Sequence, residues 1–439
     1  MPHRDSTCMT LNLPGCAPEP ALPPGFSRAP LPARKSVPHV LPYGRQTISE
    51  DDIAAVVAVL RSDFITQGPV VEAFEQRFAK QVGARHAIAV NSATAALHLA
   101  LRVAGVGAGH RVVTSPITFL ASANAAAFVG ATPDFCDIDP VSYTLNPREL
   151  EKNWKADTRA VVAVDYAGQA CDMPEIARIA RSRGAVVIED ACHGVGGSFH
   201  TEAAPQQTWK IGGHPWADLT VFSFHPVKTM TTGEGGMLVT DRKDWADLAR
   251  TLRSHGIVRD PANFETPADD GLLGEQGPWF YEMQELGFNY RMTEIQAALG
   301  RSQLNRLEFF LMRRREIVAA YNAAFAGHDW LRTPGLRQAA DAWTTSWHLY
   351  TLQLDFPALG KTRTETMAKL RQDGIGTQVL YIPVHLQPWY RKTFGYSAGK
   401  CPVAEAFYAR ALSLPLYSAM SDADVGKVIA AVLALGSKS

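Results

Sequence analysis

A lysine and an aspartate stand at the ends of two apolar segments of this 439-residue chain. Lys228 follows the run Leu219–Phe224 within SFHPVK and precedes the glycine-rich TMTTGEGG. Asp190 follows the run Ala185–Glu189 and precedes ACHGVGG. A desolvated amine can form a Schiff base with an aldehyde, and a carboxylate can keep a pyridine nitrogen protonated. The two residues therefore predict a site for pyridoxal 5′-phosphate (PLP).

Groups that could bind a phosphate stand near these two residues. Ser223 precedes Lys228 in SFHPVK and can offer its hydroxyl. The stretch NSATAAL, which begins at Asn91, follows an apolar run and opens a helical pattern. Free backbone amides at a helix N-terminus, here those of Ala93 and Thr94, bind anions. We expect a phosphate cradle here, although many helices begin after an Asn-Ser pair without binding a ligand.

Two more side chains have both a functional and a structural interpretation. His193 closely follows Asp190 and could hydrogen-bond the phenolic oxygen of the cofactor, or be a buried structural histidine. Phe119 lies in SPITFLASAN and could stack on the pyridine ring, or belong to the core.

Composition excludes several classes of protein. Lys+Arg and Asp+Glu both number 43, so no net charge attracts the chain to nucleic acid or to an anionic membrane. No apolar stretch is long enough to cross a bilayer. The six cysteines contain no CxxC pair, so we expect neither a metal site nor a disulfide framework. This use of cysteine is typical of a reducing compartment, and we expect a cytoplasmic location. The proline-rich residues 1–40 predict a disordered extension.

The elements that must position these residues alternate in type. Seven strands are expected, at Ala87–Asn91, Arg111–Ser115, Pro133–Ile138, Val161–Val164, Ala185–Glu189, Leu219–Phe224 and Met237–Thr240. Amphipathic helical segments such as Thr94–Ala104 and Met173–Arg183 lie between them. Near-continuous apolar strands that alternate with helices indicate an α/β fold whose mostly parallel sheet is covered on both faces.

The pattern changes after the sheet. A helical stretch, Met292 to Phe325, carries Arg313, Arg314 and Arg315, which we interpret as part of a solvated face. This stretch is followed by two shorter predicted strands, Trp347–Leu354 and Gly376–Leu380, and by a helix that begins at Ser421. We therefore expect a large domain over residues 41–325, including an N-terminal arm, and a smaller α+β domain over residues 326–439.

From about residue 41 onward the chain resembles the DegT/DnrJ/EryC1/StrS sugar-nucleotide aminotransferases, which have PLP fold type I, the aspartate aminotransferase fold. The matching segments are TQGP at Thr66, NSATAAL at Asn91, SPITFLASAN at Ser115, VDYAGQ at Val164, EDACHGVGG at Glu189, SFHPVKTMTTGEGG at Ser223, RSHG at Arg253 and FNYRMTEIQAALG at Phe288. The first 36 residues and the stretch Asn263–Gly277 match nothing in the family. Many relatives have glycine where Ala93 stands, but a methyl group leaves the amides free.

Within the family, the chain is most similar to the branch that makes pseudaminic acid precursors, UDP-4-amino-4,6-dideoxy-N-acetyl-β-L-altrosamine transaminase. The segments that carry this similarity are LPYGRQ at Leu41, RSDFITQGP at Arg61, the Ala93 turn, HPVK and YIPVHLQPWY at Tyr381. The resemblance implies that L-glutamate donates an amino group to C4 of a UDP-4-keto-6-deoxy-N-acetylhexosamine, leaving 2-oxoglutarate.

The resemblance also implies a role for each site residue. Lys228 would form the Schiff base, and Asp190 would pair with the pyridine nitrogen. Phe119, His193, Ser223 and the Ala93–Thr94 turn would bind the cofactor. Asn289 would reach the phosphate from a neighbouring subunit, which implies a homodimer with shared sites. The sugar nucleotide would contact Tyr43, Asp63, Phe64, Ile65, Thr66, Tyr381, Ile382, Pro383, Val384 and His385.

Three alternatives remain open from the sequence. In a deoxygenating branch of the family, histidine replaces the Schiff-base lysine, and Lys228 argues against it. The acceptor could be another 4-keto sugar nucleotide, of the perosamine or bacillosamine type. A regulatory protein without turnover is the remaining alternative, but the N-terminal segment is neither basic nor typical of a helix-turn-helix.

Overall fold

The structure is a computed structural model, and it describes residues 40–267 and 276–436. These described residues belong to one compact unit. The predicted extension over residues 1–40 therefore lies, apart from Val40, outside the described residues. In the described part no helix is long and apolar enough to cross a membrane.

Seven strands form one sheet in the order β1-β9-β8-β5-β4-β2-β3. Their bounds are β1 (His86–Val90), β2 (Arg111–Thr114), β3 (Thr132–Phe135), β4 (Thr158–Val164), β5 (Val186–Asp190), β8 (Leu219–Ser223) and β9 (Gly236–Thr240). Only β9 runs antiparallel to its neighbours, β1 and β8. The prediction of a mostly parallel, seven-stranded sheet is confirmed.

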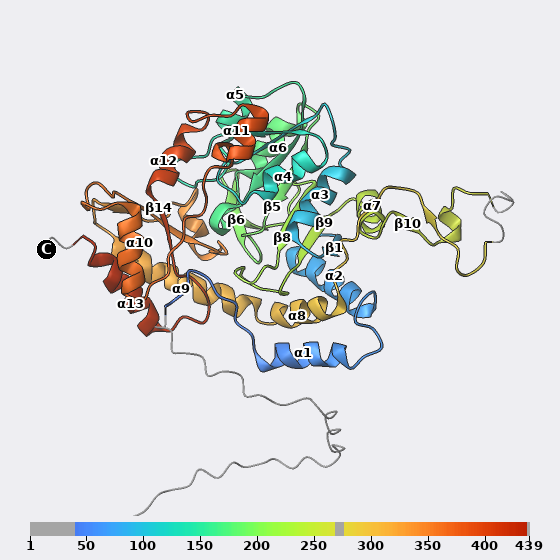
Figure 1. Cartoon of the computed structure of the whole chain (residues 1–439), viewed down its shortest axis with the longest axis horizontal. Helices are drawn as coiled ribbons and strands as arrows, with labels where there is room; N and C mark the ends of the chain where they lie inside the picture. The colour runs from blue at the N-terminus through green and yellow to red at the C-terminus, as the bar shows by residue number, and fades with distance from the viewer. Residues whose placement is uncertain (1–39, 268–275, 437–439) are drawn as a thin grey trace, which may run out of the picture. The chain divides into compact units, whose positions relative to one another are not determined.

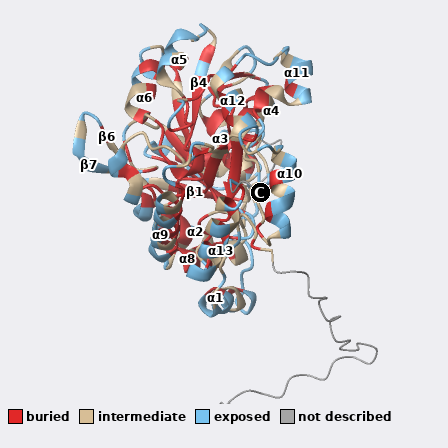
Figure 2. Ribbon diagram, turned by 90° about the vertical axis from the view of Figure 1, so that its left-hand side faces the viewer, coloured by how far each residue is buried: buried red, intermediate tan, exposed pale blue. Residues whose placement is uncertain are grey.

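Helices cover both faces of this sheet (Figure 1). Successive residues of β4 alternate between two cores, with Val161 and Ala163 in one and Ala160 and Val162 in the other. The first core includes residues of α2 (Pro69–Val82), α6 (Met173–Arg181), α8 (Glu294–Leu304) and α9 (Leu307–Phe325). The second includes residues of α3 (Ala93–Val103), α4 (Ala121–Phe128) and α7 (Lys243–Arg253). Figure 2 shows the strands as the buried centre of the molecule.

The C-terminal part builds a second sheet of three antiparallel strands, β12 (Leu331–Arg332), β13 (Tyr350–Leu354) and β14 (Ala411–Leu414). The helices α10 (Arg363–Gln372), α11 (Pro388–Phe394), α12 (Pro402–Arg410) and α13 (Asp422–Leu433) accompany it. The predicted helix from Ser421 is confirmed, since Ser421 caps α13. The predicted strand Gly376–Leu380 is wrong, because only Gln378 forms a bridge there, to Ser413. The domain boundary near residue 325 stays a prediction.

Other elements lie at the periphery. The helix α1 (Glu50–Leu60) packs along α8, and α5 (Pro147–Lys152) packs on α6. The hairpin β6 (Ser198–Thr201) and β7 (Ala204–Lys210) was not expected from the sequence. The short strands β10 (Ile257–Val258) and β11 (Glu282–Met283) pair in a segment that projects beside α7 (Figure 1).

The interpretation of Arg313, Arg314 and Arg315 as a solvated face is wrong. Arg314 is buried, and its Nη1 donates to the carbonyl oxygens of Trp347, His348 and Leu416. Arg313 bridges to the Met420 carbonyl oxygen. Arginine at this turn of α9 therefore joins the helix to the C-terminal strands and loops by satisfying their carbonyl groups.

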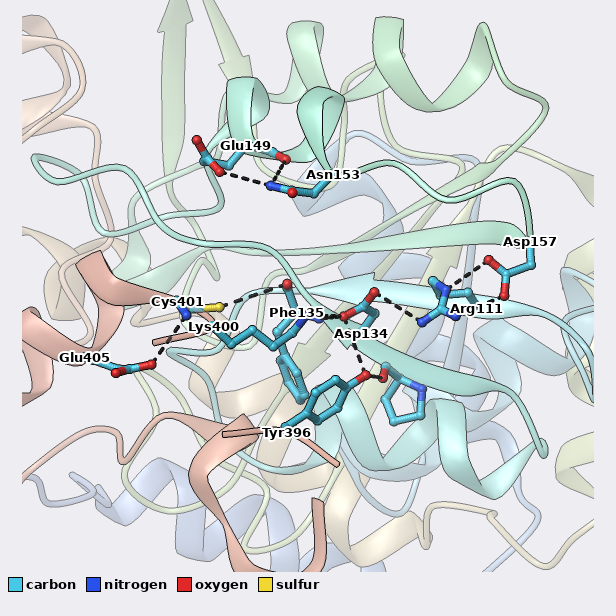
Figure 3. Close-up of polar contacts among 11 residues, drawn as sticks. Arg111, Asp134, Phe135, Glu149, Asn153, Asp157, Tyr396, Lys400, Cys401 and Glu405 are labelled. Carbon is cyan, nitrogen blue, oxygen red and sulfur yellow. Dashed lines mark hydrogen bonds and ion pairs between the residues drawn. The ribbon is translucent and has the colours of Figure 1, made fainter. Parts of the chain in front are cut away.

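The C-terminal part also attaches to the edge strand β3 (Figure 3). Oδ2 of Asp134 accepts a hydrogen bond from Arg111 Nη1 at 3.1 Å, and Oδ1 forms an ion pair with Lys400 Nζ at 2.7 Å. Arg111 in turn binds Asp157 through two nitrogens, at 2.9 and 3.1 Å. The ammonium group of Lys400 lies 4.9 Å from the ring centre of Tyr396. These contacts fix the loop that precedes α12 against the sheet.

Candidate active site

The carboxyl ends of six strands share one edge of the large sheet, because β1 and the parallel strands all point the same way. Catalytic groups of open α/β sheets collect at such an edge. A cavity of about 470 Å³ lies there. It is lined by Tyr43, Ser92, Ala93, Thr94, Leu97, Thr118, Phe119, Ala121, Ser122, Val164, Asp190, Cys192, His193, Ser223, His225, Val227, Lys228, Glu234, Gly235, Leu380 and Tyr381.

The structure brings Lys228 and Asp190 to this cavity. The adjacent strands β5 and β8 carry them there, with Asp190 opposite Val221 in the register. Desolvation lowers the pKa of Lys228, although Cys192 and Asp190 nearby oppose the shift. A lower pKa increases the fraction of neutral amine, which is the nucleophilic form.

Asp190 is held by two hydrogen bonds. Its Oδ2 accepts from the hydroxyl of Ser122 at 2.6 Å, and its Oδ1 accepts from the amide of Cys192 at 3.2 Å. The hydroxyl of Thr118 lies 2.7 Å from that of Ser122 and donates to it, because Ser122 gives its own proton to the carboxylate. Ser122 and Thr118 were not expected in the site. Both belong to SPITFLASAN, which lies far from Asp190 in the sequence, so no local pattern indicated this contact.

The predicted phosphate cradle has free donors. Ser92 caps α3, where its hydroxyl accepts from the amide of Ala95 and its carbonyl from that of Ala96. The amides of Ala93 and Thr94 have no acceptor in the described part of the chain. Orphan amides at a helix start are suited to a phosphate.

Ser223 and Gly236 complete this cradle. They are paired across β8 and β9, and Gly236 is also paired with Val90 at the end of β1. A Cβ on Gly236 would lie 2.6 Å from the amide nitrogen of Ala93, so glycine is what lets the strand reach the helix start. The hydroxyl of Ser223 accepts only a long contact, 3.4 Å, from the amide of His225. That hydroxyl remains available as a donor.

Aromatic groups form the other wall of the cavity. The Phe119 ring is 59% exposed although it lines the cavity, so it is not a core residue. Its centre lies 6.3 Å from that of Tyr381. His193 lies 3.3 Å, through Nε2, from the Tyr381 hydroxyl, and burial lowers its pKa well below the usual range. His193 is therefore a neutral ring that faces the site.

Several predicted substrate residues lie outside this cavity. Asp63, Phe64, Ile65 and Thr66 are exposed on the loop before α2, where Thr66 bridges to Thr293. Ile382 is exposed, and Pro383 and Val384 are buried, Val384 in the core beside β3. His385 is buried and bonded to Glu405 at 2.9 Å. Of the predicted substrate residues, only Tyr43 and Tyr381 line the cavity, and the role of the others stays a prediction.

Asn289 also lies outside the cavity of its own chain. The flanking rings of Phe288 and Tyr290 stack with centres 4.9 Å apart, and both pack near His98 of α3. Because side chains alternate along an extended segment, Asn289 is exposed on the opposite side. Its carbonyl oxygen accepts from Asn91 Nδ2 at 3.3 Å. This orientation is compatible with the predicted reach into a neighbouring subunit.

Comparisons with known proteins give the family. The model of the DegT/DnrJ/EryC1/StrS aminotransferase family matches residues 46–433. This chain belongs to that family. It is 43% identical over 395 residues to the spore coat polysaccharide biosynthesis protein SpsC of Bacillus subtilis, covering 90% of this chain and 96% of SpsC. An uncharacterised protein of Methanocaldococcus jannaschii, MJ1066, is 41% identical over 392 residues, which are 89% of this chain and 96% of MJ1066.

Solved structures agree with the family. Helicobacter pylori PseC, an aminotransferase involved in the biosynthesis of pseudaminic acid, superposes with a TM-score of 0.79 at 28% identity, covering 90% of this chain and 99% of PseC. A putative sugar aminotransferase from Streptococcus pneumoniae in its PLP form gives 0.78 at 28% identity, covering 90% and 98%. The chain is therefore a PLP-dependent sugar aminotransferase of fold type I. The free amides, the Ser223 hydroxyl, Lys228 and Asp190 fit the phosphate, aldehyde and pyridine nitrogen of PLP.

Proposed function

We propose that this DegT/DnrJ/EryC1/StrS family member transfers the amino group of L-glutamate to C4 of a UDP-linked 4-keto-6-deoxy-N-acetylhexosamine. The product would be a UDP-4-amino-4,6-dideoxy sugar for nonulosonate synthesis of the pseudaminic acid type. The supporting observation is Lys228 at the strand edge of a cavity that also holds Asp190 and a phosphate cradle. The likeness to PseC over 90% of the chain supports the choice of acceptor.

Different residues of this chain move protons, hold the cofactor and bind the sugar. When bound, PLP supplies an aldehyde that carries the amino group and a ring that withdraws electrons. Lys228 Nζ removes the proton from Cα of glutamate, and in the second half-reaction delivers a proton to C4 of the sugar. Asp190, oriented by Ser122, holds the proton of the pyridine nitrogen. Tyr43 and Tyr381 line the side of the cavity that we assign to the sugar.

A homodimer is part of this proposal. Asn289 points away from its own cavity, and the segment around β11 exposes Trp279, Tyr281 and Met283, at 65%, 51% and 62%. Exposed apolar groups of this size mark interaction surfaces. A second copy that covers them would bring Asn289 to its phosphate cradle.

The proposal is tested by incubating the enzyme with PLP, glutamate and single 4-keto sugar nucleotides, and measuring product mass. The expected substrate is the 4-keto sugar that an inverting 4,6-dehydratase makes from UDP-N-acetylglucosamine. Amination of its C5 epimer, or of GDP- or dTDP-linked keto sugars alone, would place the enzyme with perosamine- or bacillosamine-type aminotransferases. Absence of any aminated product across the set would favour a regulatory protein.

A further inference from the structure

Tyr381 is placed in the cavity by contacts on both sides of its backbone and ring. The carbonyl oxygen of the preceding residue, Leu380, accepts from the hydroxyl of Tyr166 at 2.6 Å. Tyr166 is itself fully buried at the end of β4. The Tyr381 ring lies nearly parallel to that of His193, at 20°, with centres 6.2 Å apart. The position of its hydroxyl is thus set by the same strand ends that carry the site.

The hydrogen bonds around His193 fix which atom carries its proton. Nδ1 accepts from the backbone amide of Ala167 at 3.2 Å, so Nδ1 has no proton of its own. A neutral imidazole must then carry its hydrogen on Nε2. Nε2 lies 3.3 Å from the Tyr381 hydroxyl oxygen and donates to it. The hydroxyl oxygen of Tyr381 is therefore an acceptor in this pair, and its own hydrogen points elsewhere.

An uncommon backbone conformation places the Ala167 amide where it can donate to Nδ1 of His193. Ala167 has φ 59°, in the left-handed region that alanine seldom adopts. Its carbonyl oxygen accepts from the amide of His348 at 2.8 Å, and the His348 ring packs on His193 with centres 4.3 Å apart. Burial also raises the pKa of Tyr381, which keeps its hydroxyl protonated at neutral pH.

We propose that Tyr381 is a catalytic residue of the acceptor half-reaction, donating its hydroxyl hydrogen to the carbonyl oxygen of the keto sugar. The amine that the bound cofactor would supply bonds through its nitrogen to the carbonyl carbon of the sugar. The π electron pair of the carbonyl group then moves to the oxygen, and the Tyr381 hydroxyl stabilises the negative charge that develops there. The two hydrogens of the amine then leave with that oxygen as water, and a carbon–nitrogen double bond remains. Tyr381 regains its hydrogen and undergoes no net change. This inference rests on the proposed keto-sugar acceptor.

The test separates the two half-reactions in the variant Tyr381→Phe. Stopped-flow absorbance follows the loss of the PLP form with glutamate alone, and then its return when the keto sugar nucleotide is added. Removing one hydrogen-bond donor to a developing oxyanion costs on the order of 10²-fold in rate. We expect that loss in the acceptor half-reaction, with the donor half-reaction within about threefold of wild type.

Controls distinguish this role from a structural one. Tyr408→Phe removes a hydroxyl outside the cavity lining and should leave both half-reactions unchanged. The affinity of the apoprotein for PLP, measured by fluorescence quenching, should be the same in Tyr381→Phe and wild type. Equal slowing of both half-reactions, or an acceptor half-reaction as fast as wild type, overturns the proposal. A wild-type enzyme that aminates no 4-keto sugar nucleotide contradicts the proposed function instead.

Discussion

The hydroxyl of Ser122 lies 2.6 Å from Oδ2 of Asp190, at the start of α4 and the end of β5 respectively. This bond joins the SPITFLASAN segment to the strand that carries the predicted partner of the pyridine nitrogen. It makes one face of α4 part of the cofactor site. The orientation of Asp190 therefore depends on a residue that follows a different strand.

Replacing Ser122 by alanine should weaken PLP binding and slow turnover. A hydrogen bond to a charged group contributes about 1.5–3 kcal/mol, which corresponds to roughly a tenfold to hundredfold loss. Fluorescence quenching of the apoprotein by PLP measures the affinity. Ser182→Ala, which removes a hydroxyl bound to the Ile179 carbonyl oxygen, serves as the control. Unchanged affinity and turnover in Ser122→Ala would show that the bond is dispensable.

Replacing Gly236 by alanine should damage the phosphate cradle. The added Cβ would lie 2.6 Å from the amide nitrogen of Ala93, so either β9 or the start of α3 must move. Overpacking of this kind costs about 1–3 kcal/mol, and we expect PLP affinity to fall about tenfold or more. Gly426→Ala in α13, where a Cβ meets nothing within 4 Å, is the matched control. Wild-type PLP affinity in Gly236→Ala would contradict the assigned cradle.

The apoprotein should lose stability as pH falls below about 6.5, partly through His193 and His348. Burial lowers the pKa of both rings well below the usual value, so the folded protein stays unprotonated while the unfolded chain takes up protons. Each such group lowers the free energy of unfolding by about 1.4 kcal/mol per pH unit between about pH 6.5 and its own pKa in the folded protein. Above about pH 6.5 it does not change the free energy of unfolding.

Urea unfolding between pH 7 and 5 measures this effect. His348→Gln should flatten the loss of unfolding free energy with falling pH, whatever its effect at pH 7. Ser182→Ala, which changes no titratable group, should keep the wild-type slope. An equal slope in His348→Gln and wild type would mean that His348 does not contribute.

Asp134→Asn should destabilise the protein without abolishing chemistry. Asp134 lies between Arg111 and Lys400, so the amide leaves two cations without their shared carboxylate (Figure 3). We expect a loss of about 1–3 kcal/mol in chemical unfolding, with little change in PLP affinity. Lys152→Met breaks an exposed ion pair to Glu149 and should change stability by less than about 1 kcal/mol. Equal stability of both variants would refute a role for Asp134 in attaching the C-terminal part.

The large sheet could be predicted because its strands are short apolar runs buried on both faces. The same rule failed for β7, whose residues Ala204–Lys210 read APQQTWK and are mostly exposed. The strand predicted at Gly376–Leu380 was also wrong, because this segment, GTQVL, makes only a single bridge, from Gln378 to Ser413. Buried arginine was missed because Arg314 looks like any basic helix residue until the carbonyl groups around it are known.

The parts of the site that could be predicted are those in which a reactive side chain directly follows a strand or begins a helix. Lys228, Asp190, Ser223 and the turn at Ala93 came from local patterns, and the structure brings them to one cavity. Ser122 and the Ala167–His193–Tyr381 chain depend on contacts between distant segments, which no local pattern contains. The loop Asp63–Thr66 and Asn289 lie outside the cavity of one chain, so the roles assigned to them stay predictions.

The most direct measurement of the central assignment is borohydride reduction of the PLP-loaded protein, followed by peptide mapping. Reduction makes the link between PLP and its lysine permanent, so the modified residue can be located by mass. We expect the label on the peptide that contains Lys228, and none in Lys228→Ala, whose turnover should fall at least about 10³-fold. Label on a different lysine, or undiminished turnover in Lys228→Ala, would contradict the account.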